Sequence, residues 1–152
     1  MGRKAKNNGW KRVLSFIVFF IYMCGVIYFM FFSEKLGRVD KTLGYRYNLT
    51  PFLEIKRFYY VLKHNFSFDA ILNLGGNVVA FIPFGMILPM LSKKKTGLIK
   101  VTVLTLLFSF TIESLQLFYK VGVFDIDDMI LNTLGGIAGY IFYCIGKVLM
   151  KK

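Results

Sequence analysis

The sequence predicts an all-α, multi-pass membrane protein with four transmembrane helices and a short amphipathic helix on the membrane surface. Three observations support this fold class. The 152 residues are 56% hydrophobic and 18% aromatic, and their mean hydropathy of +0.56 is too high for a soluble domain of this length. Long apolar runs recur along the chain. Basic residues flank these runs. Since one helical span needs about 20 apolar residues, the chain has room for about four spans and no sizeable soluble domain.

The charge and cysteine content narrow the classes of partner. A net charge of +12 is compatible with nucleic-acid binding, but the basic residues flank apolar runs and do not form one continuous patch. We interpret them as orientation signals and contacts to anionic lipid, so membrane lipids are expected partners and nucleic acid is not. Cys24 and Cys144 lie inside apolar runs, which indicates small core residues. We expect no disulfide framework, metal or other cofactor.

The N-terminal third is predicted to hold one span and one surface helix. Residues 1–12 form a basic arm, and residues 13–32 form an apolar run too long for a signal-peptide core and without an A-x-A-like cleavage site. Residues 33–69 form the one long outer connection, with an amphipathic helix at about residues 51–64. There Thr50 can cap a helix whose first residue is Pro51. One face of that helix would carry Phe52, Ile55, Tyr59 and Leu62.

The rest of the chain predicts three further spans, at residues 70–91, 98–119 and 129–150. Pro83 and Pro89 make a kink in the first of these expected. The next span carries one polar stripe at helical spacing, namely Thr102, Thr105, Ser109, Glu113 and Gln116. A matching stripe in the last span consists of Asp128, Asn132, Gly135 and Gly139, whose Gly-x-x-x-Gly pair allows close helix approach.

The distribution of charge predicts the orientation. With cytoplasmic N- and C-termini and four spans, twelve basic residues and no acidic residue fall on the cytoplasmic side, and all eight acidic residues fall on or towards the outer side. The first outer loop also carries seven basic residues, which weakens this asymmetry. Multi-pass insertion in a cell membrane with both termini in the cytoplasm is the predicted topology.

Under this topology, acidic and amide side chains of three spans meet at one depth in the outer leaflet. An ionisable group inside a span costs about 2.5–3.5 kcal/mol and is a functional-site candidate by default. We therefore expect a polar pocket open to the outer surface. The candidate ligand-binding residues are Asn73, Asn77, Glu113, Gln116, Asp125, Asp127, Asp128 and Asn132.

Structural interpretations compete with this one. Asp125 followed by Asp128 is also the pattern of a helix N-cap with a carboxylate in the first turn. Asn73, Asn77 and Asn132 are equally typical of hydrogen bonds that hold helices together in the membrane. Glu113 is harder to explain structurally, since a glutamine would serve without a charge. No Walker, nucleophile-elbow or metal-helix motif is present.

Four ordered motifs resemble those of the VanZ-like family of bacterial membrane proteins. They are N-L-T-P-F at residues 48–52, N-L-G-G-N-V-V-A-F-I-P-F-G at 73–85, E-S-L-Q at 113–116 and F-D-I-D-D-M-I-L-N-T-L-G-G at 124–136. The resemblance implies a VanZ-like domain over residues 45–150. Many relatives carry an arginine shortly before the D-I-D-D run, where this chain reads K-V-G-V at 120–123. If that arginine pairs with a carboxylate, Lys120 or Arg46 must replace it here, or the ligand differs.

The resemblance also implies a function, because the founding member of the family is associated with resistance to teicoplanin-type glycopeptide and lipoglycopeptide antibiotics. We expect a non-enzymatic factor that binds an amphiphile, either a lipoglycopeptide or a lipid-linked cell-wall precursor. One alternative is a small intramembrane enzyme, with Glu113 as general base and Asp125, Asp127 and Asp128 holding a divalent cation. Another is an ion pathway with Glu113 as the proton carrier. The sequence leaves the catalytic residues and the oligomeric state open.

Overall fold

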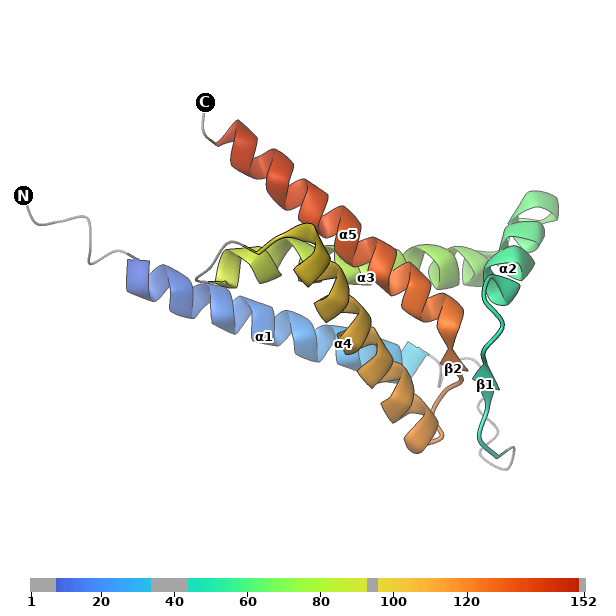
Figure 1. The fold of residues 1–152 in the computed structure, drawn as a ribbon. Helices are drawn as coiled ribbons and strands as arrows, with labels where there is room; N and C mark the ends of the chain where they lie inside the picture. The colour runs from blue at the N-terminus through green and yellow to red at the C-terminus, as the bar shows by residue number, and fades with distance from the viewer. Residues whose placement is uncertain (1–7, 34–43, 93–95, 151–152) are drawn as a thin grey trace, which may run out of the picture.

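The computed structural model describes residues 8–33, 44–92 and 96–150. These residues form five helices and two very short strands (Figure 1). In chain order they are α1 (Asn8–Ser33), β1 (Tyr47–Asn48), α2 (Leu53–His64), α3 (Phe68–Leu91), α4 (Leu98–Phe118), β2 (Phe124–Asp125) and α5 (Ile126–Leu149). Part of the predicted basic arm, the middle of the first connection and the basic turn at residues 93–95 lie outside the described residues.

The helices α3, α4 and α5 are each long and apolar enough to cross a membrane. In α1 the corresponding apolar stretch among the described residues is shorter, Phe16–Tyr28. The predicted helical, multi-pass membrane class is therefore supported, while the predicted count of four spans is not confirmed. Large apolar side chains are exposed along all of these helices, as expected for surfaces that face lipid.

Glycines bring α3 and α5 into close backbone contact. A Cβ atom added at Gly135 would overlap the carbonyl of Val78, and one added at Gly139 would overlap the carbonyl of Ile82. On α3, a Cβ at Gly85 would overlap the backbone of Gly136. The predicted role of the Gly135-x-x-x-Gly139 pair is therefore confirmed, because only a residue without a side chain allows this approach.

The core joins α1 and α4 to this pair. Phe84 of α3 stacks on Phe108 of α4 with ring centroids 5.1 Å apart, and Phe81 is fully buried between helices. The hydroxyl of Tyr22 on α1 donates a hydrogen bond to the carbonyl of Ala80. Val26 of α1 is buried in the same cluster. Thus α1 packs along the bundle, and its first turn lies at the end opposite α2 (Figure 1).

Several element boundaries differ from the prediction. Helix α1 begins at Asn8, inside the predicted arm, where Lys11 and Arg12 are residues of high helix propensity. Helix α5 begins at Ile126, three residues earlier than expected. The parallel pairing of β1 with β2, which aligns Asn48 with Asp125, was not predicted.

Two predictions about side-chain placement were wrong. Cys24 is exposed on the surface of α1 and Cys144 is half-buried, so neither is a core residue; in lipid, apolar side chains need not face the protein interior. Thr50 does not cap α2, whose N-cap is Phe52 in a left-handed conformation with φ 64° and no side-chain cap of its own.

Candidate functional site

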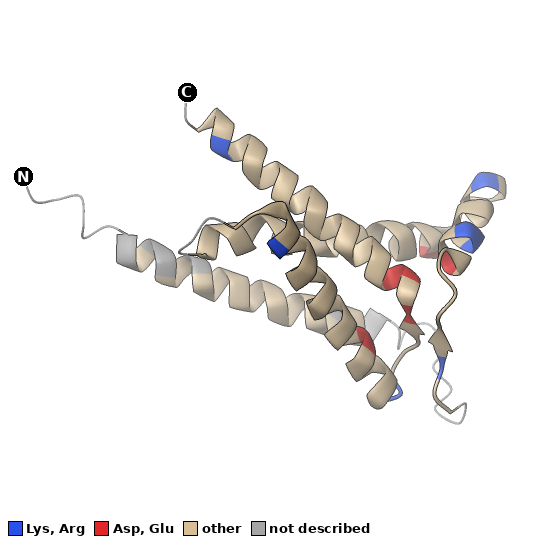
Figure 2. Cartoon of the chain, viewed as in Figure 1, with Lys and Arg blue, Asp and Glu red and all other residues tan. Residues whose placement is uncertain are grey.

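Acidic residues gather at the end of the bundle where α3 and α5 begin and α4 ends, and basic residues lie along the neighbouring α2 (Figure 2). This is the end at which the sequence placed the candidate residues. The backbone brings the segment from β1 to α2 across the start of α5. Each candidate residue is described below by the contacts that its side chain makes.

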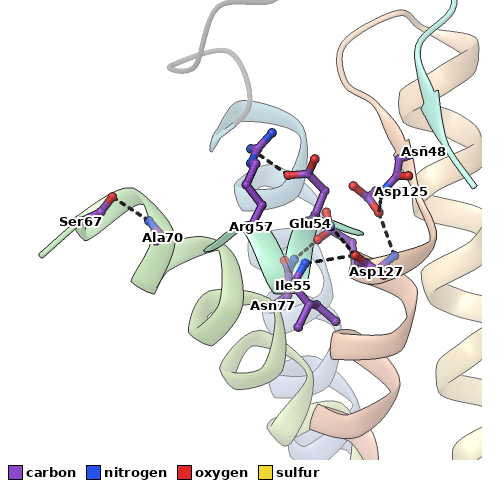
Figure 3. A network of polar contacts seen from close by, with 10 residues as sticks. Asn48, Glu54, Ile55, Arg57, Ser67, Ala70, Asn77, Asp125 and Asp127 are labelled. Carbon is purple, nitrogen blue, oxygen red and sulfur yellow. Dashed lines mark hydrogen bonds and ion pairs between the residues drawn. The ribbon is translucent and has the colours of Figure 1, made fainter. Parts of the chain in front are cut away.

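Asp127 holds the first turn of α2. It is 0% exposed, and its carboxylate accepts hydrogen bonds from three backbone N–H groups, those of Phe52 at 2.5 Å, Glu54 at 2.7 Å and Ile55 at 3.1 Å (Figure 3). Helix N-termini leave N–H groups without intrahelical partners. A residue of α5 therefore supplies the cap that α2 lacks in its own sequence.

Asp125 caps its own helix and also holds β1. Its Oδ1 atom accepts from the N–H of Asp127 at 2.8 Å and from the side-chain amide of Asn48 at 3.1 Å. The β1–β2 pairing places Asn48 opposite Asp125. The N-cap role that the sequence offered as an alternative for Asp125 is thus observed.

Glu113 extends this series to α4. Its side chain is buried, and Oε2 accepts from the N–H of Asp125 at 3.0 Å. Three carboxylates therefore follow one another, and each accepts a hydrogen bond from a backbone N–H of the next segment. We call this set, Glu113, Asp125 and Asp127, the carboxylate row. It ties α4, β2, α5 and α2 together.

The remaining candidate side chains bond to different neighbours. Asn77 of α3 donates to Asp128 at 2.6 Å. Deeper in the bundle, Asn132 donates to the hydroxyl of Ser109 at 2.8 Å. Gln116 turns to α1 and donates to the carbonyl of Met30 at 2.9 Å. These three residues thus make separate interhelical contacts, and the predicted ligand-binding pocket stays a prediction.

Asn73 is exposed on α3 and takes no part in these hydrogen bonds. The sequence pattern placed it with Asn77 because the two are one turn apart. Only Asn77 is buried. Asn73 therefore does not share the buried position of Asn77, although both lie on the same helix.

Sequence reasoning missed Asn48, Glu54 and Arg57. Arg57 forms an ion pair with Glu54 at 2.7 Å (Figure 3), whereas Lys120 lies over the ring of Tyr45 at 4.8 Å and Arg46 is exposed. Among the described residues, the cation that pairs with a carboxylate at this end of the bundle is thus Arg57, and not Lys120 or Arg46. The i, i+3 spacing of Glu54 and Arg57 on a helix was the available signal.

Burial raises the pKa of two carboxyl groups at this end of the bundle. Desolvation raises the pKa of Asp125 above its ordinary 3.8, opposed by its hydrogen bond from the N–H of Asp127. Desolvation likewise raises the pKa of Glu54, opposed by the nearby charge of Arg57. Perturbed carboxyl groups of this kind are found at functional sites and also in structural networks.

The geometry does not fit a cation held jointly by Asp125, Asp127 and Asp128. Both oxygens of Asp127 accept backbone N–H groups, and Asp128 turns to Asn77 on another helix. Within the described ranges, no group of three or more His, Cys, Asp or Glu side chains is placed to hold a metal ion.

An apolar groove of about 390 Å³ lies on the other side of α5, against α4. None of the eight candidate residues lines it. Its lining consists of Leu106, Ile126, Met129, Ile130, Thr133 and Leu134. Ile126 stands between Asp125 and Asp127 in the chain, so one end of the groove lies at the level of the carboxylate row.

Comparison with known proteins gives a family match. The family model described as VanZ/LLP1 matches residues 19–148. The chain is also similar to Protein VanZ of Enterococcus faecium, with 31% identity over 105 residues. That alignment covers 69% of this chain and 56% of the relative, so the chain spans little more than half of the relative's length. No solved structure matches the chain.

Proposed function

The chain belongs to the VanZ/LLP1 family, and from this we propose that it is a non-enzymatic membrane protein that lowers susceptibility to glycopeptide and lipoglycopeptide antibiotics. This membership confirms the resemblance noted in the four sequence motifs. In the proposal, the protein binds an amphiphile at the end of the bundle that holds the carboxylate row, where α3 and α5 begin and α4 ends. We call this the acidic end. The amphiphile is a lipoglycopeptide or a lipid-linked cell-wall precursor.

The observation that carries the proposal is the carboxylate row. Glu113, Asp125 and Asp127 are all buried and joined through backbone N–H groups to four elements at one end of the bundle. Such a network holds the surrounding segments in one arrangement. At its edge the side chain of Arg57, which is paired with the half-buried Glu54, remains exposed and accessible to a ligand.

The apolar groove supplies the second half of an amphiphile site. It starts at Ile126, beside the carboxylate row, and reaches Leu134, about 12 Å further along α5 at 1.5 Å per residue. The hydroxyl of Thr133 is already bonded to the carbonyl of Met129, so the groove presents an apolar lining. A hydrocarbon chain fits this lining while its polar head meets the acidic end.

The topology of the proposal has four spans, with both termini in the cytoplasm and the acidic end in the outer leaflet. Contacts of α1 with the bundle through Tyr22 and Val26 support its inclusion as a span. Labelling tests this orientation. With Cys24 and Cys144 replaced by serine, a single cysteine at Tyr59 should react with a membrane-impermeant thiol reagent added to intact cells.

A deletion strain complemented with variants tests the function. Glu113→Gln removes the buried, ionisable carboxyl group and keeps an oxygen that can accept from the N–H of Asp125. It should abolish the change in glycopeptide susceptibility at unchanged membrane abundance, and Thr111→Val, on the exposed side of the same helix, should retain wild-type behaviour. Unaltered resistance in Glu113→Gln would count against the acidic end. Lipid-precursor analysis of the same strains separates ligand binding from turnover.

A small intramembrane enzyme acting on a lipid-linked substrate is the second candidate. Its support is the burial that raises the pKa of Asp125 and Glu54, because a carboxyl group that keeps its proton to higher pH can serve as an acid. Precursor turnover that is lost in Asp125→Asn at unchanged membrane abundance would favour this candidate.

A further inference from the structure

Helix α2 has two distinct faces. The inward face consists of half-buried residues, namely Glu54, Ile55, Phe58, Val61 and Leu62. This face packs on α3 and α5, so the apolar residues Ile55 and Leu62 contact the protein. The sequence had placed them with Tyr59 on a membrane-facing side, but Tyr59 is exposed. The face that α2 leaves uncovered is therefore a different one from the predicted apolar face.

The outward face of α2 combines cations with tyrosines and carries no acidic side chain. Its exposed residues are Leu53, Lys56, Arg57, Tyr59, Tyr60, Lys63 and His64. Arg57 is paired with Glu54. Lys56 and Lys63 form no ion pair with a described carboxylate, and they lie two turns apart, about 10 Å along the helix. Tyr59 and Tyr60 lie between them on the same side, since residues three and four apart share a helix face.

Aromatic residues continue this surface to the start of α3. Phe66 is 84% exposed and Phe68 is 62% exposed, at the turn that joins α2 to an apolar helix long enough to cross a membrane. Figure 1 shows α2 lying across the end of the bundle at this turn. Exposed aromatic rings at the end of a span are typical of the membrane–water interface.

We propose that the outward face of α2 binds the anionic headgroups of phospholipids in the leaflet at this end of the bundle. Lys56 and Lys63 contact the phosphate groups, and the hydroxyls of Tyr59 and Tyr60 donate hydrogen bonds to them. Phe66 and Phe68 insert among the upper parts of the acyl chains. Charge complementarity identifies the partner, because an uncompensated pair of lysines beside interfacial aromatic rings fits an anionic lipid surface. This inference is independent of the proposed function.

The test uses the full-length protein in lipid nanodiscs, with a fluorescent reporter on α2. Trp10 is replaced by phenylalanine and Tyr60 by tryptophan, which makes position 60 the one tryptophan in the chain. Brominated phosphatidylglycerol or brominated phosphatidylcholine is then titrated at equal fractions of the bilayer. We expect the fluorescence of the tryptophan at position 60 to be quenched at a lower bilayer fraction of brominated phosphatidylglycerol than of brominated phosphatidylcholine. Equal quenching by the two lipids, or none by either, would overturn the proposal.

Charge variants of the same reporter protein identify the residues. Each basic residue near an anionic lipid surface contributes about 1 kcal/mol of attraction. Lys56→Gln combined with Lys63→Gln should therefore lower the preference for phosphatidylglycerol about 30-fold. Lys100→Gln, an exposed lysine in the first turn of α4 away from α2, should leave it unchanged. Preference retained in the double variant would contradict the assignment. Inorganic phosphate is also added to the parent reporter protein. If phosphate lowers the preference for phosphatidylglycerol as much as the double substitution does, the partner is a soluble anion and not lipid, which would overturn the proposal.

Discussion

The carboxylate of Asp127 accepts a hydrogen bond from the backbone N–H of Glu54 at 2.7 Å, although the two residues are 73 positions apart. Two further N–H groups of the same helical turn bond to this carboxylate. The cap of α2 is thus supplied by α5, and through Asp127 the D-I-D-D run holds the start of α2 against the bundle. This relationship determines how the acidic end can be tested.

Asp127→Ala should detach the start of α2. The variant leaves three N–H groups without their acceptor, and the loss of a charged cap predicts a decrease of about 2–4 kcal/mol in the free energy of unfolding. Hydrogen exchange should accelerate at Phe52, Glu54 and Ile55, which mass spectrometry of the detergent-solubilised protein measures. Asp69→Ala, an exposed acid in the first turn of α3, is the matched control and should cost about 0.3–1 kcal/mol. Equal effects of the two substitutions would argue against a special role for Asp127.

Asp125 should impose a pH dependence on stability. Its folded-state pKa lies above the ordinary 3.8, so the native state holds this proton more tightly than the unfolded state does. The contribution of Asp125 is therefore fully present below pH 3.8 and is lost as the pH rises through the raised pKa. Chemical unfolding across the acidic range should show this decrease, and Asp125→Asn should reduce its slope. An unchanged slope would mean that Asp125 does not cause the dependence.

Two glycines of α5 should respond oppositely to alanine. At Gly139 a methyl group would overlap the carbonyl of Ile82, which forces α3 and α5 apart, whereas the site of Gly146 has open space. We expect Gly139→Ala to destabilise by about 1–3 kcal/mol through overpacking. Gly146→Ala should be neutral or stabilising by up to about 1 kcal/mol, since alanine favours the helix. Thermal unfolding of both purified variants checks this, and similar shifts would contradict the close approach.

Ser109 and Asn132 should be energetically coupled. The amide of Asn132 donates to Ser109 Oγ at 2.8 Å, and both residues are fully buried. A double-mutant cycle with Ser109→Ala and Asn132→Ala should give a coupling free energy of about 0.6–1.7 kcal/mol, the range for hydrogen bonds between helices in membranes. Thr111→Ala paired with Asn132→Ala provides a control cycle, because Thr111 is exposed and bonds within its own helix. Additive effects at Ser109 and Asn132 would be inconsistent with the contact.

The structure of the acidic end was only partly predictable. The polar stripe of α4 and the buried amides Asn77 and Asn132 follow from helical spacing, because a polar residue in an apolar helix must find a partner. Spacing does not say which partner. Gln116 turns to α1 through Met30, and Asn132 to Ser109, so residues expected in one pocket serve separate contacts.

The cap of α2 illustrates the same limit. Local pattern favours Thr50 as the cap, since threonine before proline is a common helix start. The structure instead places Phe52 in a left-handed conformation and takes the cap from Asp127. Asn48 shows it too, since its partner Asp125 is 77 positions away and no local signal marks the pairing of β1 with β2.

By itself, the sequence determined the membrane class of this protein, its family, the apolar helices α3, α4 and α5 and the glycine contact between α3 and α5. These features depend on composition and on periodicity within one segment, which short-range physical chemistry controls. Only the tertiary structure decided which backbone groups the buried carboxylates hold and which face of α2 is left uncovered. Those outcomes depend on contacts between segments far apart in the chain, where a carboxylate bonds to whichever N–H groups the packing of the helices brings within reach.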